Sequence, residues 1–167
     1  DFIKKNHSVN FSNDFDKIWK WSVDNPEIFW KSIWDFTKVK GQQGSNLIKK
    51  SDIFFKNRFF PDAKLNYAEN LLIKNNNELS IIFKSENGYK NNLSWKSLNL
   101  YVYEISSWMK EQGIKKGDRV AAYLPNIPEA VIAYLSSSTL GAIWSSCSPD
   151  FGIMSVVDRF SQISPKI

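Results

Sequence analysis

The chain has 167 residues, enough for one average domain or for one domain with an extension. It carries 22 Lys and Arg against 17 Asp and Glu, a net charge of +5, and 43% of its residues are hydrophobic, which excludes a disordered tail. Nineteen of the 22 cations are lysine and are scattered along the chain. Because phosphate and base recognition favours the planar, two-pronged donor group of arginine, the excess positive charge does not predict a nucleic-acid partner.

Cysteine and histidine each occur once, as Cys147 and His7. A single cysteine excludes a disulfide within the chain, and the two residues are too few for the usual zinc ligand sets. The longest apolar run, residues 130–135, is far shorter than the roughly 20 residues that a membrane-spanning helix needs. The first seven residues carry no signal-peptide core. We therefore expect a cytoplasmic protein with no membrane partner.

Residues 1–72 are predicted to form a helical, tryptophan-rich N-terminal segment. Ser12 or Asn13 is expected to cap a first helix, and Asn25 a second helix that starts with proline. The second helix carries apolar residues at spacings of three and four, namely Phe29, Trp30, Ile33 and Trp34. Such a stripe is more often core than a partner or membrane surface. A short helix capped by Asn66 is expected near the end of the segment.

A β-hairpin and a helix are predicted next. The strands 79–84 and 89–95 are joined by a tight turn in which Gly88 supplies the positive φ. Ser94 is expected to cap the helix, and Gly113 to end it. The apolar face of this helix is predicted to contain Leu98, Tyr101 or Val102, Ile105, and Trp108 or Met109.

The last 50 residues predict an α/β fold. Strands at 119–124 and 142–147 alternate with helices at 128–139 and 152–163. A strand, a helix and a strand within about 30 residues form a βαβ unit with parallel strands. Its first helix is apolar nearly all round and must be covered on most sides, so we expect the sheet to continue, with Lys166 and Ile167 starting its next strand. Residues 73–167 are therefore expected to be the truncated start of a larger domain.

Residue patterns for catalysis are sparse. The seven glycines complete neither GxxxxGK[ST] nor GxGxxG. The hydroxyl run at 136–139 falls inside a predicted helix, where it is expected to allow close helix–sheet packing. Cys147 has no adjacent base and is expected to be a small packed residue at a strand end. Asp118 and Arg119 are expected to form a surface ion pair that contributes little, and Asp158 and Arg159 to belong to a solvated face.

The loop at 148–151 is the one place that physical reasoning favours for a ligand. It follows the carboxyl end of a parallel strand, where ligands bind in open α/β sheets, and it precedes a helix N-terminus, which attracts anions. Asp150 within the loop would repel a phosphate. A structural role as N-cap of the helix at 152–163 is therefore an equally good interpretation of Asp150.

Several segments resemble the AMP-forming acyl-CoA synthetases of the adenylating superfamily. They are GDRVAAYLPNIPEAVIA (117–133), LGAIWSSCSPDFG (140–152), DRFSQISPK (158–166) and FFPDAKLNYAENLL (59–72). The likeness covers nearly the whole chain, with residues 1–72 similar to the family's N-terminal cap and residues 73–167 to the start of its AMP-binding, adenylating domain. WSSCSPDFG favours the acetoacetyl branch, because the acetyl branch has a Gly-rich loop there.

The resemblance implies a ligase that works in two steps. ATP and acetoacetate would give an acyl-adenylate and pyrophosphate, and the CoA thiol would then displace AMP. ATP, CoA and Mg²⁺ are thus the implied cofactors, and small molecules the implied partners. The family's phosphate loop, adenine motif and catalytic lysine would all follow Ile167, so the resemblance assigns this chain no catalytic residue and no metal ligand, and residues 1–167 alone are expected to be inactive. Only Asp150 transfers, at a position where the acetyl relatives place a glycine close to CoA.

Two alternatives stay open from the sequence. The chain could belong to a synthetase for another short-chain acid, since the acid-selecting residues are expected downstream. It could also be a stand-alone, non-catalytic α/β binding module that kept this part of the fold. The oligomeric state is not fixed by the sequence.

Overall fold

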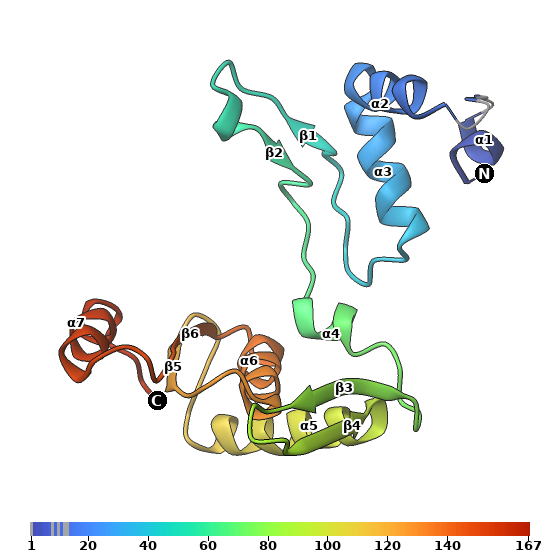
Figure 1. Cartoon of the computed structure of the whole chain (residues 1–167). Helices are drawn as coiled ribbons and strands as arrows, with labels where there is room; N and C mark the ends of the chain where they lie inside the picture. Colours follow the sequence, from blue (N-terminus) through green and yellow to red (C-terminus); the bar gives the residue numbers. More distant parts are fainter. Residues whose placement is uncertain (1, 8, 10, 12–13) are drawn as a thin grey trace. The chain divides into compact units, whose positions relative to one another are not determined.

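The structure is a computed structural model that describes residues 2–7, 9, 11 and 14–167 (Figure 1). It contains two compact units, Asp1–Leu65 and Asn66–Ile167. Over the described ranges, no helix combines the length and the apolar character that crossing a lipid bilayer requires.

Helices α1 (Phe2–His7), α2 (Phe15–Asp24) and α3 (Pro26–Phe36) open the first unit. Asp14 caps α2, because its carboxylate Oδ1 accepts a hydrogen bond from the Lys17 amide at 3.2 Å. Ser12 and Asn13, the caps expected from the sequence, lie outside the described residues. The tryptophan-rich helices at the start of the chain are confirmed.

The expected capping of α3 by Asn25 is confirmed in position but not in its side-chain hydrogen bond. Asn25 occupies the N-cap position and Pro26 the first turn, but the Asn25 side-chain amide donates to the carbonyl of Trp21 at 3.1 Å. It therefore completes the C-terminal end of α2, because the two helices are separated by this single residue. The aromatic stripe of α3 packs within its own unit, with ring centroids 5.3 Å apart for Trp30–Phe59 and 5.0 Å apart for Trp34–Phe60.

A small antiparallel hairpin follows α3. Strands β1 (Ile48–Lys49) and β2 (Arg58–Phe59) enclose the 3₁₀ turn η1 (Phe54–Lys56), with Ile48 opposite Phe59 (Figure 1). Strands of two residues are too short to show the alternation of apolar and polar residues by which a strand is recognised in a sequence. The sequence therefore does not predict this hairpin.

Gly41 and Gly44 let the chain run close to itself next to this hairpin. Gln42 and Lys64 exchange backbone hydrogen bonds of 2.8 Å. At Gly44 the backbone has φ +82°, and a Cβ atom there would lie 2.7 Å from the Cβ of Asp62. Glycine is thus required twice over at this position, by conformation and by space.

We predict that Gly44→Ala destabilises the first unit more than Gly88→Ala destabilises the second. Gly88 has nearly the same φ, +86°, but nothing lies within 4 Å of its added Cβ. The control therefore carries only the backbone strain, about 1–2 kcal/mol, whereas Gly44→Ala adds overpacking of about 1–3 kcal/mol. Amide hydrogen exchange in the unit that holds each glycine measures both losses. Equal losses would show that the chain simply moves apart.

The second unit begins with helix α4 (Tyr67–Leu71), the hairpin β3 (Leu79–Lys84) and β4 (Lys90–Ser94), and helix α5 (Trp95–Glu111). Its local signals are as predicted. Asn66 Oδ1 accepts from the Glu69 amide and Ser94 Oγ from the Ser97 amide, each at 3.1 Å. Gly88 turns the hairpin with a positive φ. Helix α4 packs on the helix that precedes the last strand, with the rings of Tyr67 and Tyr134 5.7 Å apart.

The βαβ unit is confirmed. Strand β5 (Arg119–Tyr123), helix α6 (Pro128–Thr139), strand β6 (Ile143–Cys147) and helix α7 (Ile153–Ile163) end within one residue of the predicted bounds. The two strands are parallel, with Arg119 opposite Ile143 and Tyr123 opposite Cys147. Their carboxyl ends therefore meet at one edge of the sheet, from which the loop to α7 departs (Figure 1).

The end of the chain pairs with the other edge of β5. Lys166 donates its amide to the carbonyl of Arg119 at 2.8 Å, and the Ala121 amide donates to the carbonyl of Ile167 at 2.7 Å. The residues of β5 alternate in direction, and β6 pairs with the backbone groups that point the other way, such as the carbonyl of Asp118, which accepts from the Ile143 amide. Residues 164–167 do not form a strand and the sheet consists of β5 and β6, so the expected start of a next strand is represented only by these two backbone hydrogen bonds to β5.

The core of the second unit lies between α5 and α6. Its main cluster of buried residues is Ala68, Leu93, Leu98, Val102, Ile132 and Leu135, and a second consists of Met109, Ile114 and Val120. On α5, Val102 and Met109 are buried rather than Tyr101 and Trp108. The prediction of Ile105 as a core residue is wrong: its side chain is 38% exposed, and Ser106, 6% exposed, faces the core instead. The buried stripe of α5 runs through Leu98, Val102, Ser106 and Met109, at spacings of four, four and three residues, and Ile105 lies at its margin.

One side-chain cluster ties the chain end to the start of β5. The Lys115 amide donates to Asp118 Oδ2 at 2.7 Å, and Lys166 Nζ donates to the same oxygen at 3.0 Å and to the carbonyl of Gly113 at 2.6 Å. The amide of Lys115, and then the ammonium of Lys166, hold the pKa of Asp118 below its ordinary 3.8.

We predict a pH dependence of stability from this cluster. Because the pKa of Asp118 is lowered by folding, its contribution is fully present above pH 3.8 and is lost as the pH falls through the folded-state pKa. Urea unfolding of the wild type and of Asp118→Asn should therefore differ at neutral pH and converge in acid, down to about pH 2. Asp158→Asn is the control. A difference between Asp118→Asn and wild type that persists unchanged in acid would contradict the assignment.

Candidate functional site

The loop between β6 and α7 occupies the edge of the sheet that the sequence singled out. It spans residues 148–152, and Gly152 takes the N-cap position of α7. Asp150 is exposed, and its carboxylate Oδ2 accepts a hydrogen bond from Ser148 Oγ at 2.7 Å. The expected role of Asp150 as a helix cap is therefore wrong, because Asp150 precedes the cap by two residues and its side chain folds back onto Ser148.

Residues from two other elements hold this loop. The Tyr123 hydroxyl at the end of β5 is 3.0 Å from the carbonyl oxygen of Pro149 and 3.1 Å from that of Phe151. From α7, the Arg159 guanidinium carbon lies 4.5 Å from the centroid of the Phe151 ring, within cation–π range. Asp158 and Arg159 are both exposed, as expected for a solvated face, and Arg159 in addition lies over the Phe151 ring. Sequence reasoning missed Tyr123, because its partners are 26 and 28 residues away.

The residues of the loop suit neither a phosphate nor a metal ion. A phosphate cradle needs converging backbone N–H groups, whereas this loop has a proline, which has no N–H, and a carboxylate. The loop thus suits a neutral or hydrogen-donating part of a ligand better than a phosphate. In the part of the chain that the structure describes, no group of three or more His, Cys, Asp or Glu side chains could hold a metal ion.

The hydroxyl run at 136–139 has a structural role. Ser136 is fully buried, and its Oγ lies 2.8 Å from the carbonyl oxygen of Ile132 and 3.2 Å from that of Val102 on α5. The small side chains allow close packing, as expected, but the Val102 contact is one between two helices rather than between helix and sheet.

The remaining candidates from the sequence are also structural. Cys147 is 5% exposed at the end of β6, as predicted. His7 is in the first unit, where its Nε2 lies 2.6 Å from Ser32 Oγ. The surface ion pair expected between Asp118 and Arg119 is not the main contact of either side chain. Asp118 pairs with Lys166, and the Arg119 guanidinium donates to the carbonyls of Ile163 and Ser164 at 2.7 and 3.1 Å and so completes the end of α7.

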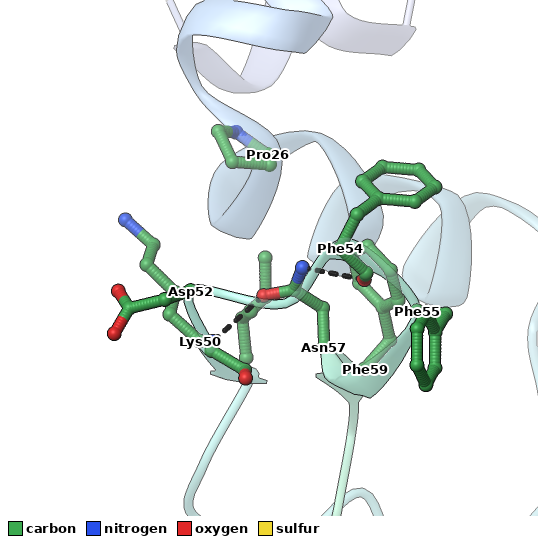
Figure 2. A pocket seen from close by; sticks show the side chains of 9 residues that line it. Pro26, Lys50, Asp52, Phe54, Phe55, Asn57 and Phe59 are labelled. Atoms are coloured by element: carbon green, nitrogen blue, oxygen red, sulfur yellow. Dashed lines mark hydrogen bonds between the residues drawn. The ribbon is translucent and has the colours of Figure 1, made fainter.

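Each unit also has an open hollow. In the first, a hollow of about 760 Å³ is walled by Phe54, Phe55 and Phe59, with Lys50 and Asp52 at one side (Figure 2). The amide of Asn57 joins its two sides by accepting from the Ser51 amide and donating to Phe54 (Figure 2). The sequence signal was the dense run of phenylalanines at 54–60, and the hollow can cover apolar groups.

The hollow in the second unit has a volume of about 460 Å³ and lies where β4, α5 and α6 meet. Leu93, Ile105 and Ile132 supply apolar wall, and Glu104 and Glu129 supply negative charge. Neither hollow includes a residue of the 148–152 loop. The loop is therefore a separate feature of the fold.

Comparison with known protein families agrees with this architecture. A sequence model described as AMP-binding enzyme matches residues 74–167, more than half of the chain. A second, described as the N-terminus of acetyl-coenzyme A synthetase, matches residues 15–71. The chain belongs to the AMP-binding enzyme family.

Similar proteins include several acetoacetyl-CoA synthetases. That of Rhizobium meliloti (strain 1021) is 44% identical over 154 residues, which are 92% of this chain and 24% of that protein. That of Xenopus tropicalis is 37% identical over 169 residues, 99% of this chain and 25% of that protein. The solved acetoacetyl-CoA synthetase from Streptomyces lividans has a TM-score of 0.89 and 32% identity over 98% of this chain and 26% of that chain.

These relatives confirm the predicted resemblance, including its acetoacetyl branch, and the predicted α/β fold class. The chain spans about a quarter of the length of each relative.

We predict that Ser136→Val destabilises the second unit by about 1–3 kcal/mol, because valine overfills the contact between α5 and α6. Ser136→Ala should cost less, about 1 kcal/mol, since it removes only the hydroxyl. Ser161→Val, at an exposed position of α7, is the matched control. Chemical denaturation measures all three. A Ser136→Val protein as stable as the control would refute the packing role.

Proposed function

We propose that the chain is the N-terminal part of an acetoacetyl-CoA synthetase. The observation that carries the proposal is similarity to proteins of that name across 92–99% of the chain, together with the TM-score of 0.89 to one of them. The complete protein would join ATP and acetoacetate into an acyl-adenylate with release of pyrophosphate. The CoA thiol would then displace AMP. Its partners are these small molecules, with Mg²⁺ as the cation that accompanies ATP.

In this proposal residues 1–72 are the helical N-terminal cap and residues 73–167 begin the adenylating domain. The two family matches support that division, because one ends at residue 71 and the other begins at residue 74. A cytoplasmic location is compatible with the single cysteine, which allows no disulfide within the chain.

The loop at 148–152 is proposed to line the entrance for CoA. Its support is its place at the carboxyl end of β6, the edge at which open α/β sheets bind ligands. Asp150 is exposed there and its carboxylate is an acceptor. It would therefore face an N–H or O–H donor of the ligand, whereas the phosphates of CoA would bind elsewhere in the complete protein.

We expect the complete protein to form AMP in a reaction that depends on both acetoacetate and CoA, and residues 1–167 alone to form none. AMP release measured with acetoacetate, acetate and propionate at equal concentrations tests the acid. Preference for acetate or propionate would replace the proposal by a synthetase for another short acid. Failure of the complete protein to release AMP with all three acids would favour a non-catalytic binding module, and AMP release by residues 1–167 alone would refute the expected inactivity of the isolated chain.

A further inference from the structure

The loop at 148–152 is fixed from several directions at once. Tyr123 holds it from β5, with its hydroxyl 3.0 Å from the carbonyl oxygen of Pro149 and 3.1 Å from that of Phe151. Arg159 covers the Phe151 ring from α7 at 4.5 Å. Ser148 bonds to the Asp150 carboxylate within the loop itself. A surface loop of this length would otherwise be among the more mobile parts of a protein.

The geometry of Tyr123 suits it to this task. In the parallel register Tyr123 lies opposite Cys147, the last residue of β6. Its side chain is therefore level with the point at which β6 ends and the loop begins. A phenol has one proton to donate, and two carbonyls of the loop lie within hydrogen-bond distance of it. The hydroxyl can donate to either carbonyl, so it anchors the loop backbone at one or the other of the two residues that flank Asp150.

We propose that Tyr123 is a positioning residue for the acceptance of CoA, with Arg159 as its support on the other side of the loop. The inference rests on the proposed function, because it assumes that the loop lines the CoA entrance. A loop that is already ordered loses less conformational entropy when a ligand binds against it. Tyr123 therefore acts on CoA through the loop and contributes nothing to the adenylation step, which precedes CoA.

The test uses the complete protein and the variant Tyr123→Phe, which removes one oxygen atom and keeps the ring. Loss of one hydrogen bond of ordinary net strength should raise the KM for CoA about five-fold. Acetoacetate-dependent exchange of pyrophosphate into ATP reports adenylation without CoA and should be unchanged. Tyr103→Phe, an exposed tyrosine of α5, is the matched control and should leave both measurements unchanged.

A second variant approaches the loop from α7. Arg159→Lys keeps the positive charge but gives up the planar face over Phe151, and should raise the KM for CoA about two- to five-fold, again without changing pyrophosphate exchange. Thermal denaturation of each variant separates this effect from loss of folded protein.

Each outcome decides the matter. A raised KM for CoA with unchanged exchange supports the inference. A Tyr123→Phe protein with the same kinetics as Tyr103→Phe overturns it, as does one in which exchange and CoA-dependent turnover fall together. A wild-type protein that exchanges no pyrophosphate with any short acid overturns the proposed function, and the inference with it.

Discussion

The second unit depends on the close approach of α6 to α5. Leu135, Ser136 and Ser137 are completely buried, and Ser136 lies within hydrogen-bond distance of the backbone of α5. Because α6 connects β5 to β6, its seat on α5 fixes the pairing of the two strands. Close to Ser136, in the last turn of α6, Asn66 donates its side-chain amide to the carbonyl of Ser138 at 2.8 Å. The loop at 148–152 follows β6, so its position depends on this packing even though its own hydrogen bonds are to other residues.

Much of the fold could be predicted because its signals are local. Ser94 and Asn66 cap helices within three residues of themselves, and Gly88 turns a hairpin by its own φ. The apolar run of α6 and the flanking strands predicted the βαβ unit for the same reason. Where a residue had two local options, the sequence did not decide. Asn25 can serve the helix before it or the helix after it, and the structure shows the former.

The candidate site was harder to derive, since its decisive contacts join residues distant in the chain. The position of the loop followed from strand order alone. The role of Asp150 did not, because the sequence does not show whether the helix begins directly after Asp150 or, as in the structure, after Gly152. The anchoring roles of Tyr123 and Arg119 could not be predicted from the sequence, because their hydrogen-bond partners lie 26 to 45 residues away. The resemblance to a family supplied what the local pattern could not.

The pairing of Lys166 and Ile167 with β5 affects where the boundary of an expressed protein can be placed. A protein cut after Ser164 would lose both backbone hydrogen bonds on that side of β5 and the ammonium that reaches Asp118. The carbonyl of Arg119 and the amide of Ala121 would then form an open sheet edge. Such edges recruit strands from other molecules, so expression boundaries placed there would select for aggregates and inclusion bodies.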